Sequence, residues 1–509
     1  MDLSRYPREI LTLIIEYLVL TIGIYKAVQL RLVNKTFDYE IMFAIFTRGV
    51  IDLHDPATPY LFNSLPPPLK GRVFLSKYEF KMQREDGIFS AVASVNQKLD
   101  ELTQPSEEQQ HAQHLQIAEA AGGIHSLWDK SYGQCMNQFF DEESLDALDL
   151  LGGAIVIGNL PLVQALLEPV LRFPWGGVDN LSQYFGRPLQ LAAAWGHLEI
   201  VQYLLDHGAS PYWRICIDST SVKWPENRRK LENMPHTYRC TAGTALEAAA
   251  LGGHEEIVRL LLQPEHCLPV STLEYAEAYI AAARGGSVAS IKLLLQAAGT
   301  TIGDLDGVRD DMLAQAVRHN QQAVAVYLLD HGTDVNAWSG CGIIRIAAQQ
   351  GRAQMARFLI DRGAEIDDRL SIRRPIVVAA RGGHQGVVDV LLEYGASLND
   401  AFLGAAVTQP HLLGYLLQKG VDVHAKRSET DKHTTIGRLA LLQAIQHKNP
   451  RVIKTLFDAF DAGVPLNFDG GEPMDDAVYF AKSGLAHWIV EFLLSLGVED
   501  REVRLEDIW

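Results

Sequence analysis

The sequence predicts an all-helical (all-α) solenoid of stacked repeats with a small helical head in front of it. Three observations lead to this fold class. The hexapeptide YLLDHG occurs at Tyr203–Gly208 and again, unchanged, at Tyr327–Gly332. Leucines that begin similar pairs are separated by 33, 34, 31 and 32 residues, at Leu261, Leu294, Leu328, Leu359 and Leu391. A glycine closes most copies. Self-similarity at this period is typical of a repeat array, and residues 148–498 hold about ten candidate copies.

Residues 188–208 show why each copy should be a pair of helices. Ala192 and Ala193 favour a short first helix and let a neighbouring helix approach closely. Gly196 can take the left-handed conformation that ends this helix, and Gly208 can end the second one in the same way. The second helix carries apolar residues at helical spacing, Ile200, Val201, Leu204 and Leu205. Such a pair cannot bury its apolar stripe alone, so it must stack on the next pair.

This pattern resembles the ankyrin repeat family. Thr244–Glu247 stand where that family has its T-P-L-H turn, and Val335–Asn336 match its hairpin entry. The family's Gly-His pair is matched by Gly196–His197, Gly253–His254 and Gly383–His384. Three copies depart from the pattern, at His319–Asn320, at Gln409–Pro410 and near Lys448. The resemblance implies an array that binds other proteins.

The histidines of the Gly-His pairs invite a reading as metal ligands. His197, His254 and His384 each occupy the same position of a different unit, so they do not converge easily on one ion. We therefore expect each of them to make a hydrogen bond that stabilises its turn. No catalytic residues, metal or cofactor are expected anywhere in the chain.

Residues 1–50 lack the repeat and form the predicted head. A helix should begin at Pro7 and place Ile10, Leu11, Ile14, Ile15 and Leu18 on one apolar face. Two further short helices should follow before residue 47. The segments PREILTLIIEYL and LRLVNKTFDYEI are similar to an F-box, apart from Tyr6 at the leading leucine position. The resemblance implies binding to the Skp-type adaptor of a cullin–RING ubiquitin ligase, through Pro7, Glu9, Ile10, Ile14, Leu18, Leu32 and Val33.

An F-box followed by ankyrin repeats resembles an architecture of filamentous fungi. The resemblance implies a substrate receptor, in which the head docks on the ligase and the concave face of the array holds a protein for ubiquitin transfer. An alternative stays open. Terminal units of a repeat array need a cap, so the same helices could cap an ankyrin scaffold that has no ligase link.

The segments around the array are less regular. Residues 51–80 contain Pro66–Pro68 and predict an extended linker. Residues 81–147 predict helices at Phe89–Leu102 and Gln109–Ala121, separated by a solvated loop at Ser106–Gln110, and could hide a degenerate repeat. Residues 499–509 predict an acidic C-terminal tail.

An insertion at residues 211–240 has a net charge of +3, from six basic and three acidic side chains, within a chain of net charge −17. Two readings are open: a recognition loop for an acidic partner, or a hairpin that packs on its own array around Trp213 and Trp224. Trp, Tyr and Arg often anchor interfaces. The candidate partner-binding residues are Trp195, Trp213, Trp224, Arg228, Arg229 and Trp338.

Composition excludes several other classes. The acidic balance argues against nucleic-acid binding. The most apolar stretch, Ile10–Leu20, is too short for a membrane span and carries Glu16. The five cysteines include no CxxC pair, so we expect reduced thiols in the cytoplasm or nucleus. We expect a monomer outside its complex.

Overall fold

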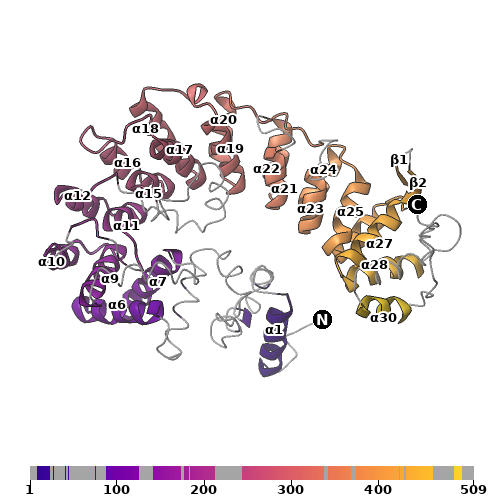
Figure 1. The fold of residues 1–509 in the computed structure, drawn as a ribbon, viewed down its shortest axis with the longest axis horizontal. Coiled ribbons are helices and arrows are strands. Elements are labelled where there is room, and N and C mark those ends of the chain that lie inside the picture. Colours follow the sequence, from indigo (N-terminus) through magenta and orange to yellow (C-terminus); the bar gives the residue numbers. More distant parts are fainter. Residues whose placement is uncertain are drawn as a thin grey trace. The chain divides into compact units, whose positions relative to one another are not determined.

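The computed structural model describes residues 8–22, 27, 40–41, 44, 71, 75, 87–124, 142–172, 177–180, 182, 184–212, 243–336, 342–367, 374–423, 425–428, 431–461 and 487–495. The chain divides into two compact units, residues 1–300 and residues 301–509. The family resemblance predicted helix pairs, and both units are built from them (Figure 1).

The N-terminal unit begins with α1 (Arg8–Ile22), followed by α6 (Gly87–Thr103) and α7 (Glu107–Ile124). Four helix pairs come next: α9 (Glu142–Val156) with α10 (Leu160–Val170), α11 (Pro188–Trp195) with α12 (Leu198–Asp206), α15 (Ala245–Gly252) with α16 (Glu255–Leu261), and α17 (Leu273–Gly285) with α18 (Val288–Ala298). First helices pack on first helices, from α9 through α11 and α15 to α17. Second helices pack on second helices in the same order.

The C-terminal unit begins with the 3₁₀ turn η3 (Ile302–Asp304) and continues with five pairs. They are α19 (Val308–Arg318) with α20 (Gln322–Asp330), α21 (Gly342–Gln349) with α22 (Ala353–Asp361), α23 (Pro375–Gly382) with α24 (Gln385–Glu393), α25 (Leu398–Thr408) with α26 (Pro410–Gln418), and α27 (Ile436–Gln446) with α28 (Pro450–Asp461). Each first helix again packs on the next one, from α19 to α27. The last described helix, α30 (His487–Ser495), contains Leu493 of the tenth candidate copy.

The pair α11–α12 forms as its sequence predicts. Ala192 and Ala193 are completely buried, and all four apolar residues predicted for the second helix are buried too. Gly196 ends α11 with φ +79°, in the left-handed region. Since small buried residues recur in the other first helices, neighbouring pairs can approach closely along each unit.

Copies that lack the Gly-His turn still form helix pairs. Asn320 takes the place of the glycine before α20 and adopts the same left-handed conformation, with φ +59°. Lys448 does so before α28, with φ +54°. Asparagine tolerates this region better than most residues. The turn geometry is therefore kept although its sequence signature is lost.

The predicted helices at Phe89–Leu102 and Gln109–Ala121 are confirmed as α6 and α7. The predicted solvated loop at Ser106–Gln110 is wrong, because α7 begins at Glu107. The Ser106 main-chain N–H donates to Gln109 Oε1 at 3.1 Å, and the Gln109 N–H donates to Ser106 Oγ at 3.4 Å. This reciprocal pair is a capping box, which starts a helix despite the polar composition.

A short hairpin precedes α27. Strands β1 (Lys426–Ser428) and β2 (Asp431–Thr435) are antiparallel, with Lys426 opposite Thr435. Thr435 then caps α27, since its hydroxyl accepts a hydrogen bond from the Arg438 main-chain N–H at 3.3 Å. The strand therefore leads directly into the next helix pair.

Several predicted features lie outside the described residues. They are the second head helix up to Val33, the proline-rich run at 66–68, most of the insertion at 211–240, and the tail at 499–509.

Candidate functional site

The three Gly-His histidines join consecutive repeats. The Nε2 atoms of His197, His254 and His384 lie 3.1 Å from the main-chain oxygens of Val156, Ala194 and Gln349, respectively. A carbonyl oxygen can only accept, so each imidazole donates to the end of the preceding first helix. The predicted hydrogen bonds are confirmed, but their acceptors lie in the preceding repeat rather than in the turn of each histidine. In the described part of the chain, no group of three or more His, Cys, Asp or Glu residues is placed to hold a metal ion.

The copy that departs from the pattern at Gln409 makes the same kind of link. Gln409 Nε2 donates to the main-chain oxygen of Arg381 at 3.0 Å. An amide N–H therefore replaces the imidazole N–H between α23 and α25. This position serves the stacking of repeats rather than a ligand.

The second helices of the C-terminal unit carry a ladder of paired polar groups. Arg362 Nη1 lies 2.8 Å from Asp330 Oδ1, which links α22 to α20. The Tyr394 hydroxyl donates to Asp361 at 2.5 Å, and Lys419 Nζ lies 2.8 Å from Asp389. Each contact joins two consecutive repeats, so the ladder reinforces the stacking.

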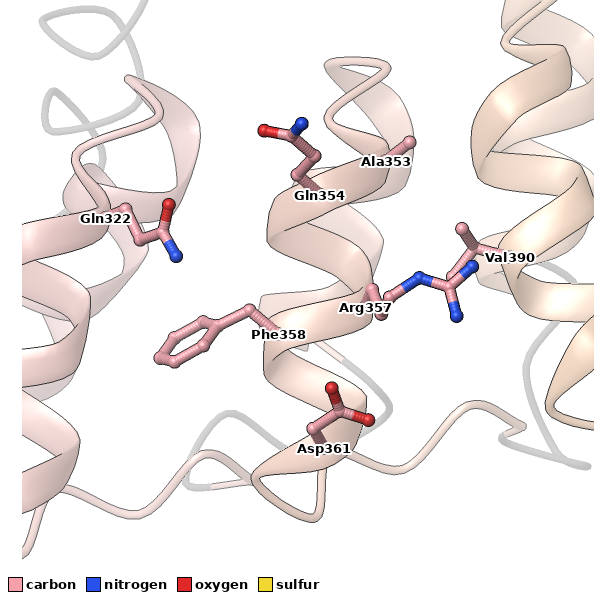
Figure 2. Close-up of a pocket in the computed structure, with 7 residues that line it drawn as sticks. All are labelled: Gln322, Ala353, Gln354, Arg357, Phe358, Asp361 and Val390. Atoms are coloured by element: carbon pink, nitrogen blue, oxygen red, sulfur yellow. The ribbon is translucent and has the colours of Figure 1, made fainter.

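A shallow depression of about 480 Å³ lies between the second helices α20, α22 and α24. Figure 2 shows Phe358 pointing from α22 towards Gln322 of α20, while Arg357 points the opposite way, towards Val390 of α24. Arg357 is paired with Glu393, and the guanidinium of Arg362 lies 5.0 Å from the centre of the Phe358 ring. The main positive charge that lines the depression, Arg357, is thus engaged in a contact between repeats.

The first helices of the C-terminal unit leave a second surface open, which we call the first-helix face. We define it by four side chains of α21, α23 and α25 that are half-buried or exposed: Arg345, Val377, Arg381 and Leu403. In α21, Arg345 is the one residue between Gly342 and Ala348 that is not buried. Arg381 is exposed in the last turn of α23.

Trp195 is the one predicted partner-binding residue among those described. It is half-buried at the end of α11, directly before the Gly196 turn. The other five, Trp213, Trp224, Arg228, Arg229 and Trp338, lie outside the described residues. Tyr212, one of the aromatic residues of the insertion, is 48% exposed, and Val270, which has no signal in the sequence, is 51% exposed. The Tyr212 hydroxyl donates to the Cys267 main-chain oxygen at 3.4 Å.

Helix α1 has two apolar faces. Leu11, Ile15 and Val19 are buried. Their neighbours on the other side are exposed: Leu13 by 64%, Ile14 by 42% and Tyr17 by 74%. The predicted single apolar face is therefore divided, with Ile14 on the exposed side.

The predicted adaptor-binding residues are only partly described. Ile14 is exposed and Leu18 is half-buried, while Glu9 and Ile10 are described as helix backbone. Pro7, Leu32 and Val33 lie outside the described residues.

Shifted pKa values occur at residues with structural roles. Burial, and then the nearby Asp149 carboxylate, raise the pKa of Tyr184 to about 12. Burial also raises the pKa of Tyr279 to about 12. Asp149 accepts a hydrogen bond from Ser182 at 2.6 Å, and Ser182 in turn accepts the Phe185 N–H at 2.9 Å. This network shapes the loop before α11. None of the described helices is long and apolar enough to cross a membrane.

Comparison with known proteins agrees with this geometry. A family model of three ankyrin repeats matches residues 246–339 and 313–402, and a single-repeat model matches residues 187–214. The ankyrin repeat and KH domain-containing protein mask-1 of Caenorhabditis elegans is 25% identical over 363 residues, which cover 65% of this chain and 13% of that protein. A protein of the same description from Caenorhabditis briggsae is 27% identical over 302 residues, covering 53% of this chain and 10% of that protein.

The matched segments are thus a small part of both worm proteins.

Among solved structures, the human ASB11 ankyrin repeat domain has 23% sequence identity and a TM-score of 0.35, covering 46% of this chain and 98% of that one. The family models match the same helix pairs that the structure stacks through their first and second helices. Residues 187–214 and 246–402 of the chain therefore match ankyrin repeat models.

Proposed function

We propose that this protein binds other proteins and serves as the substrate-recognition subunit of a cullin–RING ubiquitin ligase. In this proposal the head binds a Skp-type adaptor and the ankyrin array holds the substrate. Catalysis comes from the partner ligase. This chain raises the effective concentration of the substrate near the ubiquitin donor.

The exposed side of α1 carries the first half of the proposal. Leu13 and Tyr17 are one helical turn apart, so they lie on the same side of the helix, with Ile14 beside them. Exposing three large apolar side chains on one turn of a helix is unfavourable in water, and such patches mark interaction sites. This arrangement supports a docking face for the adaptor.

The ankyrin array supports the second half. Its second helices are tied together by the polar ladder, while the first-helix face keeps charged and apolar side chains accessible. Stacked repeats with accessible side chains on the first helices of the C-terminal unit are suited to holding a protein segment.

The alternative is an ankyrin scaffold without a ligase link, whose first 47 residues cap the solenoid. The buried side of α1 is compatible with it. Leu11, Ile15 and Val19 are buried, and the Thr12 hydroxyl donates to Glu40 at 2.9 Å inside this small core. A cap needs the buried side of the helix and has no use for the exposed one.

Co-purification with a recombinant Skp-type adaptor separates the two readings. The full chain should retain the adaptor, and a chain lacking residues 1–47 should lose it. Substituting Leu13→Ala and Tyr17→Ala together should weaken retention about ten-fold or more, since buried aromatic and aliphatic anchors dominate interfaces.

The matched control replaces two exposed apolar residues elsewhere, Tyr212→Ala and Val270→Ala, and should bind like the wild type. If the full chain fails to retain the adaptor while it is folded, the ligase proposal is wrong and the scaffold reading stands. Equal losses in the test and control variants would also contradict a specific docking face on α1.

A further inference from the structure

Two arginines stand on neighbouring first helices without a carboxylate partner. Arg345 is half-buried on α21, and Arg381 is exposed on α23. The two helices pack directly on each other. Within the described part of the chain, neither guanidinium forms an ion pair, a hydrogen bond or a contact with an aromatic ring.

Two arginines at the second helix α22 behave differently. Arg357 pairs with Glu393, and Arg362 pairs with Asp330. Those ion pairs link consecutive repeats and neutralise the charge of both arginines. The chain has a net charge of −17, so carboxylates are abundant, yet these two arginines on neighbouring helices have none as a partner within the described residues.

The surroundings of the two arginines are partly apolar. Val377 is half-buried on the same side of α23 as Arg381, since the two residues are four positions apart. Leu403 is half-buried on α25, the next first helix. On α25, the carboxylate of Asp400 is already paired with Arg374. The face therefore offers positive charge beside aliphatic surface.

We propose that the first-helix face around Arg345 and Arg381 binds an acidic segment of a partner protein that alternates carboxylate and aliphatic side chains. The proposal rests on the proposed protein-binding function of the array and names the chemistry of its partner. Guanidinium groups pair with carboxylates through two parallel hydrogen bonds. Val377 and Leu403 would then contact the aliphatic side chains.

The spacing fits an extended peptide. Packed helix axes lie about 8–10 Å apart. In an extended chain, side chains on the same face recur about every 7 Å. Long arginine side chains bridge the difference, so acidic residues two positions apart can reach both guanidinium groups.

A nucleic acid would supply negative charge as well, but the observations favour a peptide. Phosphate backbones are bound by several basic groups spread over a large surface. Here the basic groups are few, the chain is strongly acidic, and aliphatic side chains of α23 and α25 accompany the arginines.

Fluorescence anisotropy with labelled model peptides tests the proposal on the full chain. The probe is a peptide of alternating Glu and Leu, compared with a peptide of alternating Lys and Leu and with a single-stranded oligonucleotide. The Glu–Leu peptide should bind at low salt and weaken as salt is added. Substituting Arg345→Glu and Arg381→Glu together should weaken its binding by about ten-fold or more.

Two further variants keep the result interpretable. Arg345→Gln with Arg381→Gln removes the charge without reversing it and should give an intermediate loss. Arg451→Glu makes the same charge change at an exposed position of the second helix α28, and should leave binding unchanged. Circular dichroism confirms that each variant is folded.

The proposal is overturned if the Glu–Leu peptide does not bind, if the Lys–Leu peptide binds equally well, or if the double Arg→Glu variant binds like the wild type. Tighter binding of the oligonucleotide with the same arginine dependence would assign the face to polyphosphate instead. Adaptor retention by the head is measured separately. Its loss with peptide binding intact contradicts the ligase proposal alone, whereas the reverse result contradicts this inference alone.

Discussion

The imidazole of His254 donates from Nε2 to the main-chain oxygen of Ala194, 3.1 Å away and 60 residues earlier in the chain. The two residues lie in consecutive helix pairs on either side of the insertion. His254 also fills the space next to Gly196, where an added Cβ would lie 2.5 Å from its Cε1 atom. Histidine and glycine therefore form one joint between the repeats, which holds although the insertion separates them in sequence.

Replacing His254→Ala removes this joint. The free energy of unfolding should fall by about 1–2 kcal/mol, because the Ala194 carbonyl loses its partner in a partly buried place. His254→Gln should retain much of the stability, since Gln409 makes the equivalent link to Arg381 at 3.0 Å. Urea unfolding followed by circular dichroism measures both changes. An alanine variant as stable as the wild type would show that the hydrogen bond contributes nothing.

Two glycines separate backbone strain from steric clash. Gly208→Ala forces a Cβ into the left-handed region at φ +89°, with no atom within 4 Å of it, and should cost about 1–2 kcal/mol. Gly196→Ala has the same strain at φ +79° and in addition a clash with His254. We expect it to cost about 1–3 kcal/mol more. Equal melting temperatures for the two variants would contradict the clash.

Two buried tyrosines predict sensitivity to alkali. The hydroxyls of Tyr275 and Tyr279 both donate to the Leu294 main-chain oxygen, at 2.8 and 3.3 Å. Burial raises the pKa of Tyr279 to about 12, and burial, Tyr279 and Cys267 together raise that of Tyr275 further above its ordinary value.

The pKa values of Tyr275 and Tyr279 in the folded state exceed the unfolded value of about 10. The stability that the two buried neutral tyrosines contribute is therefore fully present below about pH 10. It is lost as pH rises through the folded values. Circular dichroism across this range should show unfolding that coincides with phenolate formation. The pair of changes Tyr275→Phe and Tyr279→Phe should reduce the alkali sensitivity, whereas Tyr203→Phe on α12 should not.

The ion pair at the α24–α26 contact predicts a small effect in acid. Burial alone would raise the pKa of Asp389, but hydrogen bonds from Lys419 at 2.8 Å and Tyr415 at 2.7 Å outweigh it and lower the pKa. The contribution to stability is therefore present above the unfolded pKa of about 3.9 and lost as pH falls through the lower folded value.

Asp389→Asn should cost less than about 1 kcal/mol because the pair is partly exposed, and salt should reduce the cost. NMR titration of the Asp389 carboxyl group in the wild type and in Lys419→Met measures the shift directly. The variant should titrate at a higher pH than the wild type. An unchanged titration would show that Lys419 does not hold the carboxylate.

Much of the fold follows from local sequence. The interval of about 33 residues, the paired alanines and the Gly196 turn predict helix pairs, and those pairs form. Thr244–Glu247 match the family's T-P-L-H turn, and the Thr244 hydroxyl caps α15 by accepting the Glu247 N–H at 3.2 Å. These features are predictable because each depends on residues within about one helical turn of one another.

One prediction was wrong because polar composition, which favours a loop, occurs at Ser106–Gln110 together with a capping box, which starts a helix. The polar segment at Ser106–Gln110 was expected to be a loop, yet Ser106 and Gln109 cap a helix that begins inside it. Polarity alone therefore does not identify a loop when a capping box is present.

The sequence by itself determined the repeat, its helices and its turns, and with them the resemblance to ankyrin repeats. The tertiary structure alone decided which groups meet. It set the acceptor of His254 and placed Gln409 in the role of a histidine. It also divided α1 into a buried and an exposed side, and paired Arg357 while leaving Arg345 without a carboxylate partner. Helix periodicity is set by neighbours along the chain. Pairing and exposure depend on side chains that the stacking of repeats brings together, and no local pattern records those partners.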